Sequence, residues 1–132
     1  MEQNSDTVKK IFIVEDNPDS RELVVKILKA KGYGIIQAVD GEEALQKLKE
    51  QRPDLILMDI SIPKIDGYEV TRRIKEDDGL KDVPVIALTA HAMKGDKEKA
   101  LEAGCDGYIA KPFSVRELPI LIESFLKKDL TP

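Results

Sequence analysis

The sequence predicts a single α/β domain in which helices cover both faces of a five-stranded parallel sheet. The first observation is a set of apolar runs; the clearest, residues 54–59, reads Asp-Leu-Ile-Leu-Met-Asp, with no polar break between its two acids. Such runs are typical of strands buried on both faces. They alternate with segments of helical periodicity, which is the order of a parallel sheet with crossover helices. Finally, 132 residues with 42% hydrophobic and 35% charged side chains suit one globular domain.

Turn and cap residues justify the elements one by one. We expect strands at about residues 11–14, 35–38, 54–59, 83–89 and 108–110. Capping residues ahead of an apolar face predict the start of several helices. These are Asn17 with Pro18, Asp40 with Glu43, Asp66 with Glu69, and Ser114 with Glu117. In the first helix Leu23, Val24, Ile27 and Leu28 recur at helical spacing, and Gly32 ends it; another helix spans about residues 96–103 and ends at Gly104. The domain then covers residues 9–128, with flexible ends at 1–8 and 129–132.

The last helix contains a conflict between two local signals. The capping residues predict that it starts at Val115, which places Pro119 at about the fifth position. A proline there removes a backbone hydrogen bond to Val115 and costs about 3 kcal/mol. Either the first turn opens into a wider or 3₁₀-like turn, or the helix bends away from the sheet. We expect the bend, because the following apolar residues should keep the rest of the helix docked. They are Leu121, Ile122, Phe125 and Leu126.

Composition and charge exclude several classes of function. The net charge of −4 without a basic block gives no electrostatic basis for direct binding of nucleic acid. Cys105 is the single cysteine, so an internal disulfide is excluded, which fits a reducing cytoplasm. Residues 1–10 lack the apolar core of a signal peptide, and no apolar run is long enough to span a membrane. We therefore expect a cytoplasmic protein without direct membrane contact.

Polar side chains accumulate where four of the predicted strands end. They are Glu15 and Asp16, Asp59, Thr89, and Lys111. The carboxyl ends of neighbouring parallel strands meet at one edge of a sheet, so these residues should converge. Three carboxylates repel one another, and Lys111 offsets only one of them. Such a cluster either has raised pKa values or holds a cation. Oxygen ligands without His or Cys favour a hard ion: Mg²⁺ by abundance, with Mn²⁺ or Ca²⁺ as substitutes.

In combination, these residues resemble the receiver domains of two-component response regulators, over about residues 9–126. The motifs that carry the resemblance are Glu15-Asp16, Leu57-Met58-Asp59 with Pro63 and Gly67 after it, Leu88-Thr89-Ala90, and Tyr108-Ile109-Ala110-Lys111-Pro112. The resemblance implies a flavodoxin-like doubly wound sheet of order 2-1-3-4-5, in three layers with five helices. The segment 92–96, Ala-Met-Lys-Gly-Asp, is most similar to receivers of hybrid sensor kinases and stand-alone cell-cycle regulators.

The resemblance also implies a role for each residue of the site. Asp59 would be the phosphoryl acceptor. Mg²⁺ would be ligated by Asp16, Asp59 and the Ser61 carbonyl, with Glu15, in place of the more frequent Asp, reaching it through water. Thr89 and Lys111 would hold the phosphoryl oxygens, Tyr108 would swing inward on activation, and the Lys111–Pro112 peptide would be cis.

The resemblance implies that the protein is a signalling domain and not a metabolic enzyme. The donor would be a sensor histidine kinase or a histidine phosphotransfer protein. Phosphorylation would change the face formed by the fourth helix, fifth strand and fifth helix, which would contact a downstream protein target. Slow autodephosphorylation would reset the switch, and the chain would be a monomer or a weak, phosphorylation-dependent dimer.

Other classes of protein fit less well. A flavodoxin-type electron carrier needs a phosphate-cradling loop after its first strand, whereas Glu-Asp-Asn-Pro at 15–18 would repel FMN phosphate. A Mg²⁺-dependent phosphatase with an aspartyl nucleophile would have a second Asp at position 61, which is Ser. A docking module independent of phosphorylation would lack an essential residue, and none is missing. His91 is either an exposed loop side chain or, as in the family, a residue that tunes hydrolysis together with Ser61.

Overall fold

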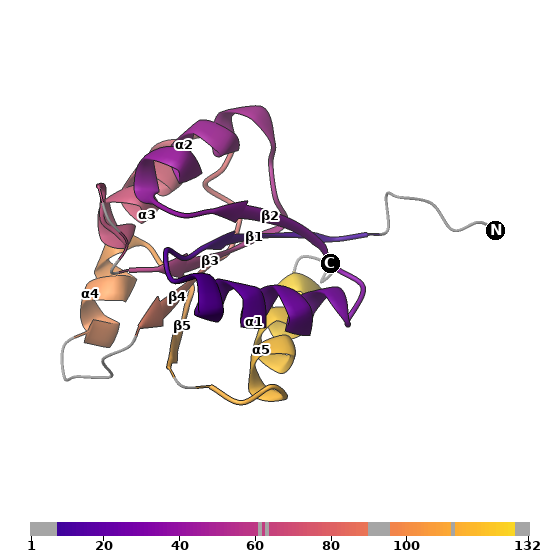
Figure 1. Ribbon diagram of the computed structural model, residues 1–132. Coiled ribbons are helices and arrows are strands. Elements are labelled where there is room, and N and C mark those ends of the chain that lie inside the picture. Colours follow the sequence, from indigo (N-terminus) through magenta and orange to yellow (C-terminus); the bar gives the residue numbers. More distant parts are fainter. Residues whose placement is uncertain (1–7, 61, 63, 90–95, 112, 129–132) are drawn as a thin grey trace.

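The computed structural model describes residues 8–60, 62, 64–89, 96–111 and 113–128 (Figure 1). Within them a five-stranded parallel sheet has the order β2-β1-β3-β4-β5, as predicted. The strands are β1 (Lys10–Val14), β2 (Gly34–Ala38), β3 (Leu55–Asp59), β4 (Val85–Thr89) and β5 (Gly107–Ala110). The helices are α1 (Pro18–Lys29), α2 (Gly41–Glu50), α3 (Gly67–Glu76), α4 (Asp96–Ala103) and α5 (Glu117–Lys128). None of these helices is long and apolar enough to cross a membrane.

The sheet is the middle of three layers. Successive side chains of a strand point to opposite faces, so each face of the sheet packs against its own layer of helices. One core cluster, which includes Phe12, Ile56 and Ala87, packs against residues of α2, α3 and α4. The other, which includes Ile13 and Leu57, packs against α1 and α5. Figure 1 shows α1 and α5 on one side of the sheet and α2 and α3 on the other. Both faces of the central strand β3 are therefore buried, which explains its unbroken apolar run.

The predicted caps form the expected hydrogen bonds. The side-chain oxygens of Asn17, Asp40 and Asp66 accept from the backbone amides three residues ahead, at 2.9, 2.7 and 3.0 Å. Strand bounds agree to within a residue or two; β4, for example, starts at Val85 rather than Val83. Of the apolar residues that recur at helical spacing in α1, Val24, Ile27 and Leu28 are buried, whereas the Leu23 side chain is 48% exposed.

The start of the last helix requires a correction. Ser114 and Glu117 do form a capping box: the amide of Glu117 donates to Ser114 Oγ at 2.9 Å, and Glu117 Oε1 accepts from the Ser114 amide at 3.3 Å. However, α5 begins at Glu117, not at Val115. Pro119 is therefore its third residue, within the first turn, where backbone amides have no helical partner. Within α5 the proline therefore removes no helical hydrogen bond, and the turn ahead of it is closed by a long bond of 3.5 Å from the Leu118 amide to the Ser114 carbonyl. The predicted bend stays a prediction.

Candidate functional site

Strand register brings the predicted site residues to one edge of the sheet. Val14 pairs with Met58, so the next two residues lie side by side: Glu15, which follows β1, and Asp59, the last residue of β3. Asp59 itself pairs with Leu88 of β4, one residue before Thr89. The backbone amide of Lys111 donates to the Thr89 carbonyl at 2.7 Å, which fixes the end of β5 beside β4. The predicted convergence is thus confirmed for the residues at the carboxyl ends of these four strands.

The three acids form a cluster that could hold a metal ion. One oxygen from each of Glu15, Asp16 and Asp59 lies within 4.8 Å of the others. Glu15 and Asp59 are only 1% and 3% exposed, whereas Asp16 is exposed at the rim. Two buried carboxylates and a third that faces solvent suit a hard divalent cation, since all the donors are oxygens and the ion can keep water on its open side. The residues therefore fit Mg²⁺.

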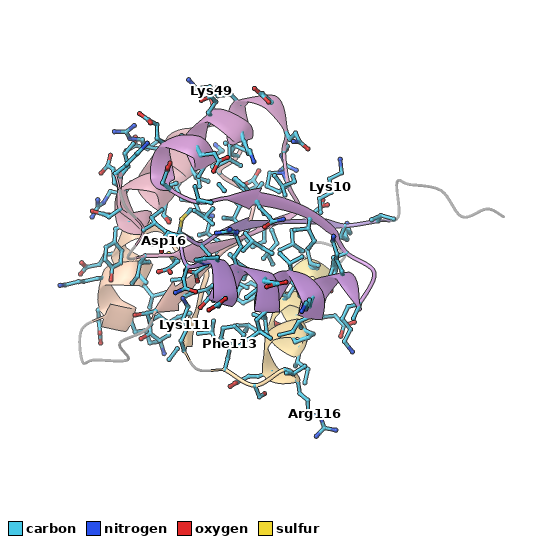
Figure 2. All side chains as sticks on the ribbon, in the orientation of Figure 1. Lys10, Asp16, Lys49, Lys111, Phe113 and Arg116 are labelled. Carbon is cyan, nitrogen blue, oxygen red and sulfur yellow. The ribbon has the colours of Figure 1, made fainter. Side chains whose placement is uncertain are left out.

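Lys111 provides the positive charge of the metal-free site. Its Nζ donates to Glu15 Oε1 at 2.5 Å and to Asp59 Oδ2 at 3.2 Å. The other carboxylate oxygen of Glu15 accepts from the Asn17 amide at 3.2 Å. Figure 2 labels Lys111 and Asp16 at this edge of the molecule. A bridge between two buried carboxylates holds the lysine amine in place, so it lies where it could also contact a group attached to Asp59.

Burial dominates the electrostatics of Glu15. The pKa of this carboxyl is raised from its ordinary 4.5 to about 7, mainly by the loss of water on burial; the hydrogen bond with Asp59 and the charge of Asp59 add to the rise, and Lys111 opposes it. For Lys111, burial by itself lowers the pKa, but the hydrogen bond to Glu15 and the two negative charges outweigh it, so its pKa is raised. Lys111 thus stays charged, while near neutral pH the metal-free acids retain part of a proton.

The remaining predicted residues lie in different settings. Thr89 is buried at the end of β4, one residue beyond Leu88, the register partner of Asp59. Tyr108 is half-buried on β5 and packs against the core cluster on the α2, α3 and α4 side of the sheet. Their predicted roles in phosphoryl binding and switching remain predictions. Ser61, His91, the segment 92–95 and the Lys111–Pro112 peptide involve positions outside the described residues.

Two residues support the site in ways that sequence reasoning did not find. Arg21 Nη1 donates to the main-chain carbonyls of Glu15 and Asp16, at 2.9 and 3.5 Å. Gly67 leaves no room for a side chain: an added Cβ would lie 2.5 Å from Ile60 Cα and 2.8 Å from the Asp59 carbonyl oxygen. The available signal for Arg21 was its place in the first turn after the Asn17 cap. Gly67 was recognised only as part of a motif, without its steric reason.

Comparison with known proteins identifies the family. Residues 11–123 match the response regulator receiver domain. The chain belongs to this family. The receiver is 48% identical to the polar-differentiation response regulator DivK of Brucella anthropi over 118 residues, which are 89% of this chain and 96% of that protein. The predicted resemblance is confirmed.

Solved structures agree with the sequence comparison. The receiver domain of sensor histidine kinase PA1611 from Pseudomonas aeruginosa, with a magnesium ion coordinated in its active site cleft, has a TM-score of 0.86 and 39% identity. The similarity covers 92% of this chain and 99% of that one. The chemotaxis response regulator CheY4 of Vibrio cholerae has a TM-score of 0.86 and 28% identity, covering 90% and 99%. Receiver domains accept a phosphoryl group from histidine kinases, so this protein is a signalling protein rather than a metabolic enzyme.

Proposed function

We propose that this receiver is a phosphorylation switch in which Asp59 accepts a phosphoryl group from the phosphohistidine of a sensor histidine kinase or a histidine phosphotransfer protein. Mg²⁺ would be held by Glu15, Asp16 and Asp59, with the Ser61 carbonyl as a further ligand. The observation that carries the proposal is the position of Asp59: it is buried, lies within 4.8 Å of both other acids, and contacts Lys111 at 3.2 Å.

The chemistry requires positioning and charge neutralisation more than proton transfer. An ionised Asp59 oxygen attacks phosphorus and forms the O–P bond while the P–N bond to the donor imidazole breaks. The imidazole nitrogen keeps the electron pair of that bond, so Asp59 needs no general base. Bound Mg²⁺ would supply positive charge for the transferring group. Lys111 can shift its donors from the carboxylates to phosphoryl oxygens, and the Thr89 hydroxyl would donate from the neighbouring strand.

The output of the switch would be a change in the surface formed by α4, β5 and α5. Thr89 would move toward the phosphoryl group, and Tyr108 would fill the space that Thr89 leaves. Attack of water on the acyl phosphate would slowly reset the domain. The switch would act on a downstream protein target in the cytoplasm. Similarity to DivK supports a pathway of the kind that its name gives, polar differentiation. The chain would act as a monomer or as a weak, phosphorylation-dependent dimer.

Intact mass spectrometry after incubation with Mg²⁺ and acetyl phosphate tests the acceptor. The wild type should gain the mass of one phosphoryl group, and Asp59→Asn should gain none, because an amide cannot form the acyl phosphate. Asp82→Asn is a matched control, since Asp82 is exposed and lies outside the acid cluster; it should react like the wild type. Phosphate uptake by Asp59→Asn would show that another residue is the acceptor.

A further inference from the structure

Arg21 connects helix α1 to the acid pair through the main chain. It is the fourth residue of α1, and its own amide donates to the Asn17 carbonyl at 2.9 Å. Its guanidinium reaches back over the start of the helix, where Nη1 donates to the Glu15 carbonyl at 2.9 Å and, over a longer 3.5 Å, to that of Asp16. One side chain therefore contacts the backbone of both acids at the end of β1.

From this geometry we infer that Arg21 is a positioning residue for the metal site, which it serves by fixing the backbone of the acid pair. The inference rests on the proposed binding of Mg²⁺ by this cluster. The Glu15 side chain is already held by Lys111 and by the Asn17 amide. Asp16 is exposed, so the direction of its carboxylate depends on the orientation of its main chain. Both bonds come from Nη1, whose two N–H donors have fixed directions in the guanidinium plane, which suits this nitrogen to hold adjacent carbonyls in one arrangement.

Two effects of Arg21 on metal affinity have opposite signs, which makes the inference testable. As a positive charge near the site, the guanidinium repels a divalent cation, so its removal would tighten Mg²⁺ binding several-fold. As a support for the ligands, it favours the binding geometry, and its removal would weaken binding. Residues that orient metal ligands typically contribute 10-fold or more to affinity, so we expect the geometric effect to dominate and the dissociation constant of Mg²⁺ to rise about 10-fold.

Isothermal titration calorimetry of the metal-free protein with Mg²⁺ measures whether removal of Arg21 weakens or tightens Mg²⁺ binding. Arg21→Gln removes both the charge and the guanidinium; Arg21→Lys keeps the charge but replaces the planar guanidinium, with its fixed N–H directions, by a freely rotating amine. Lys26→Gln is the matched control, because it removes one positive charge from an exposed position on the same helix, where Lys26 pairs with Glu22 at 3.7 Å. We expect both Arg21 variants to bind Mg²⁺ about 10-fold more weakly than the wild type and Lys26→Gln to bind equally well.

A second measurement needs no metal. The Asn17 amide donates to the Glu15 side chain, so its hydrogen exchange reports on the order of the acid-pair segment. In metal-free protein it should exchange faster in both Arg21 variants than in the wild type and Lys26→Gln, relative to amides of the central strand β3. A variant that merely lowered global stability would accelerate both sets of amides equally, and this outcome would overturn the inference.

The calorimetric outcomes separate this inference from the function proposed above. If the wild type binds Mg²⁺ and Arg21→Gln binds it equally well or more tightly, Arg21 does not position the ligands, and the metal site stands. If Arg21→Lys binds like the wild type, the fixed geometry of the guanidinium is not required for metal binding, and the inference fails. If the wild type shows no Mg²⁺ binding, the proposed metal site and this inference both fail, and the acetyl phosphate assay then tests the acceptor by itself.

Discussion

Metal-free protein should lose stability as the pH rises toward neutrality, because folding buries the Glu15 carboxyl. Burial raises its pKa from 4.5 to about 7, and Asp59 contributes to the rise while Lys111 opposes it. The unfolded chain releases this proton near pH 4.5, whereas the folded protein retains it until about pH 7. The free energy of unfolding therefore falls between these values and is constant above them. Because one pKa unit corresponds to 1.36 kcal/mol, the loss is about 3 kcal/mol, a large share of the stability of an ordinary domain.

Urea unfolding followed by circular dichroism in the presence of a chelator tests this prediction from about pH 5 to about pH 8. Glu15→Gln keeps the shape of the side chain but cannot ionise, so its stability should fall less with pH than that of the wild type, by about 3 kcal/mol over this range. Glu22→Gln is the matched control: Glu22 is an exposed glutamate of α1 and should leave the wild-type slope unchanged. Equal slopes for the wild type and Glu15→Gln would refute the reasoning. Mg²⁺ should reduce the slope of the wild type, because a cation favours the carboxylate.

Two further substitutions test the supports of the site. Lys111→Met leaves Glu15 and Asp59 buried without their cation, so unfolding above pH 7 should require about 3 kcal/mol less, and acidification should restore most of that loss; a loss independent of pH would contradict the charge argument. Gly67→Ala forces backbone atoms at the end of β3 apart and should cost about 2–3 kcal/mol in the same urea assay, with slower phosphoryl uptake. Its comparison is Gly32→Ala, where φ is +90° and no atom lies within 4 Å of the added Cβ, so only backbone strain of about 1 kcal/mol should appear; equal losses for the two alanines would contradict the steric argument.

Local chemistry in the sequence predicted the elements but could not order the strands. Each cap is a contact between residues three apart, so Asn17, Asp40 and Asp66 could be recognised without tertiary information. Apolar runs identify strands buried on both faces, yet they do not say which strands are neighbours. The order 2-1-3-4-5 depended on family resemblance, and the structure confirms it.

The error in the last helix shows how two local rules compete. The capping box predicted a start at Val115, and it does form between Ser114 and Glu117. A proline at the fifth helical position would collide with the carbonyl four residues before it, whereas a proline in the first turn loses nothing. The helix therefore begins at Glu117, which brings Pro119 into the first turn. The exclusion of proline from the helix interior overrides a favourable capping box when the helix can start two residues later.

The site shows which features of a residue can be predicted from a sequence pattern. Chemical type and position at a strand end sufficed to predict that Glu15, Asp59 and Lys111 converge, because parallel strands share one edge. The supporting contacts depend instead on where main-chain atoms point after folding. Arg21 acts on two carbonyl oxygens, and every residue has such an oxygen, so no pattern of side chains marks them as its partners. Gly67 acts through the absence of a Cβ beside Ile60. Glycine occurs at helix starts for several other reasons, so its presence in the sequence does not reveal this close contact. The acids and the lysine that carry the chemistry were therefore visible in the sequence, whereas the parts that hold them became visible only in three dimensions.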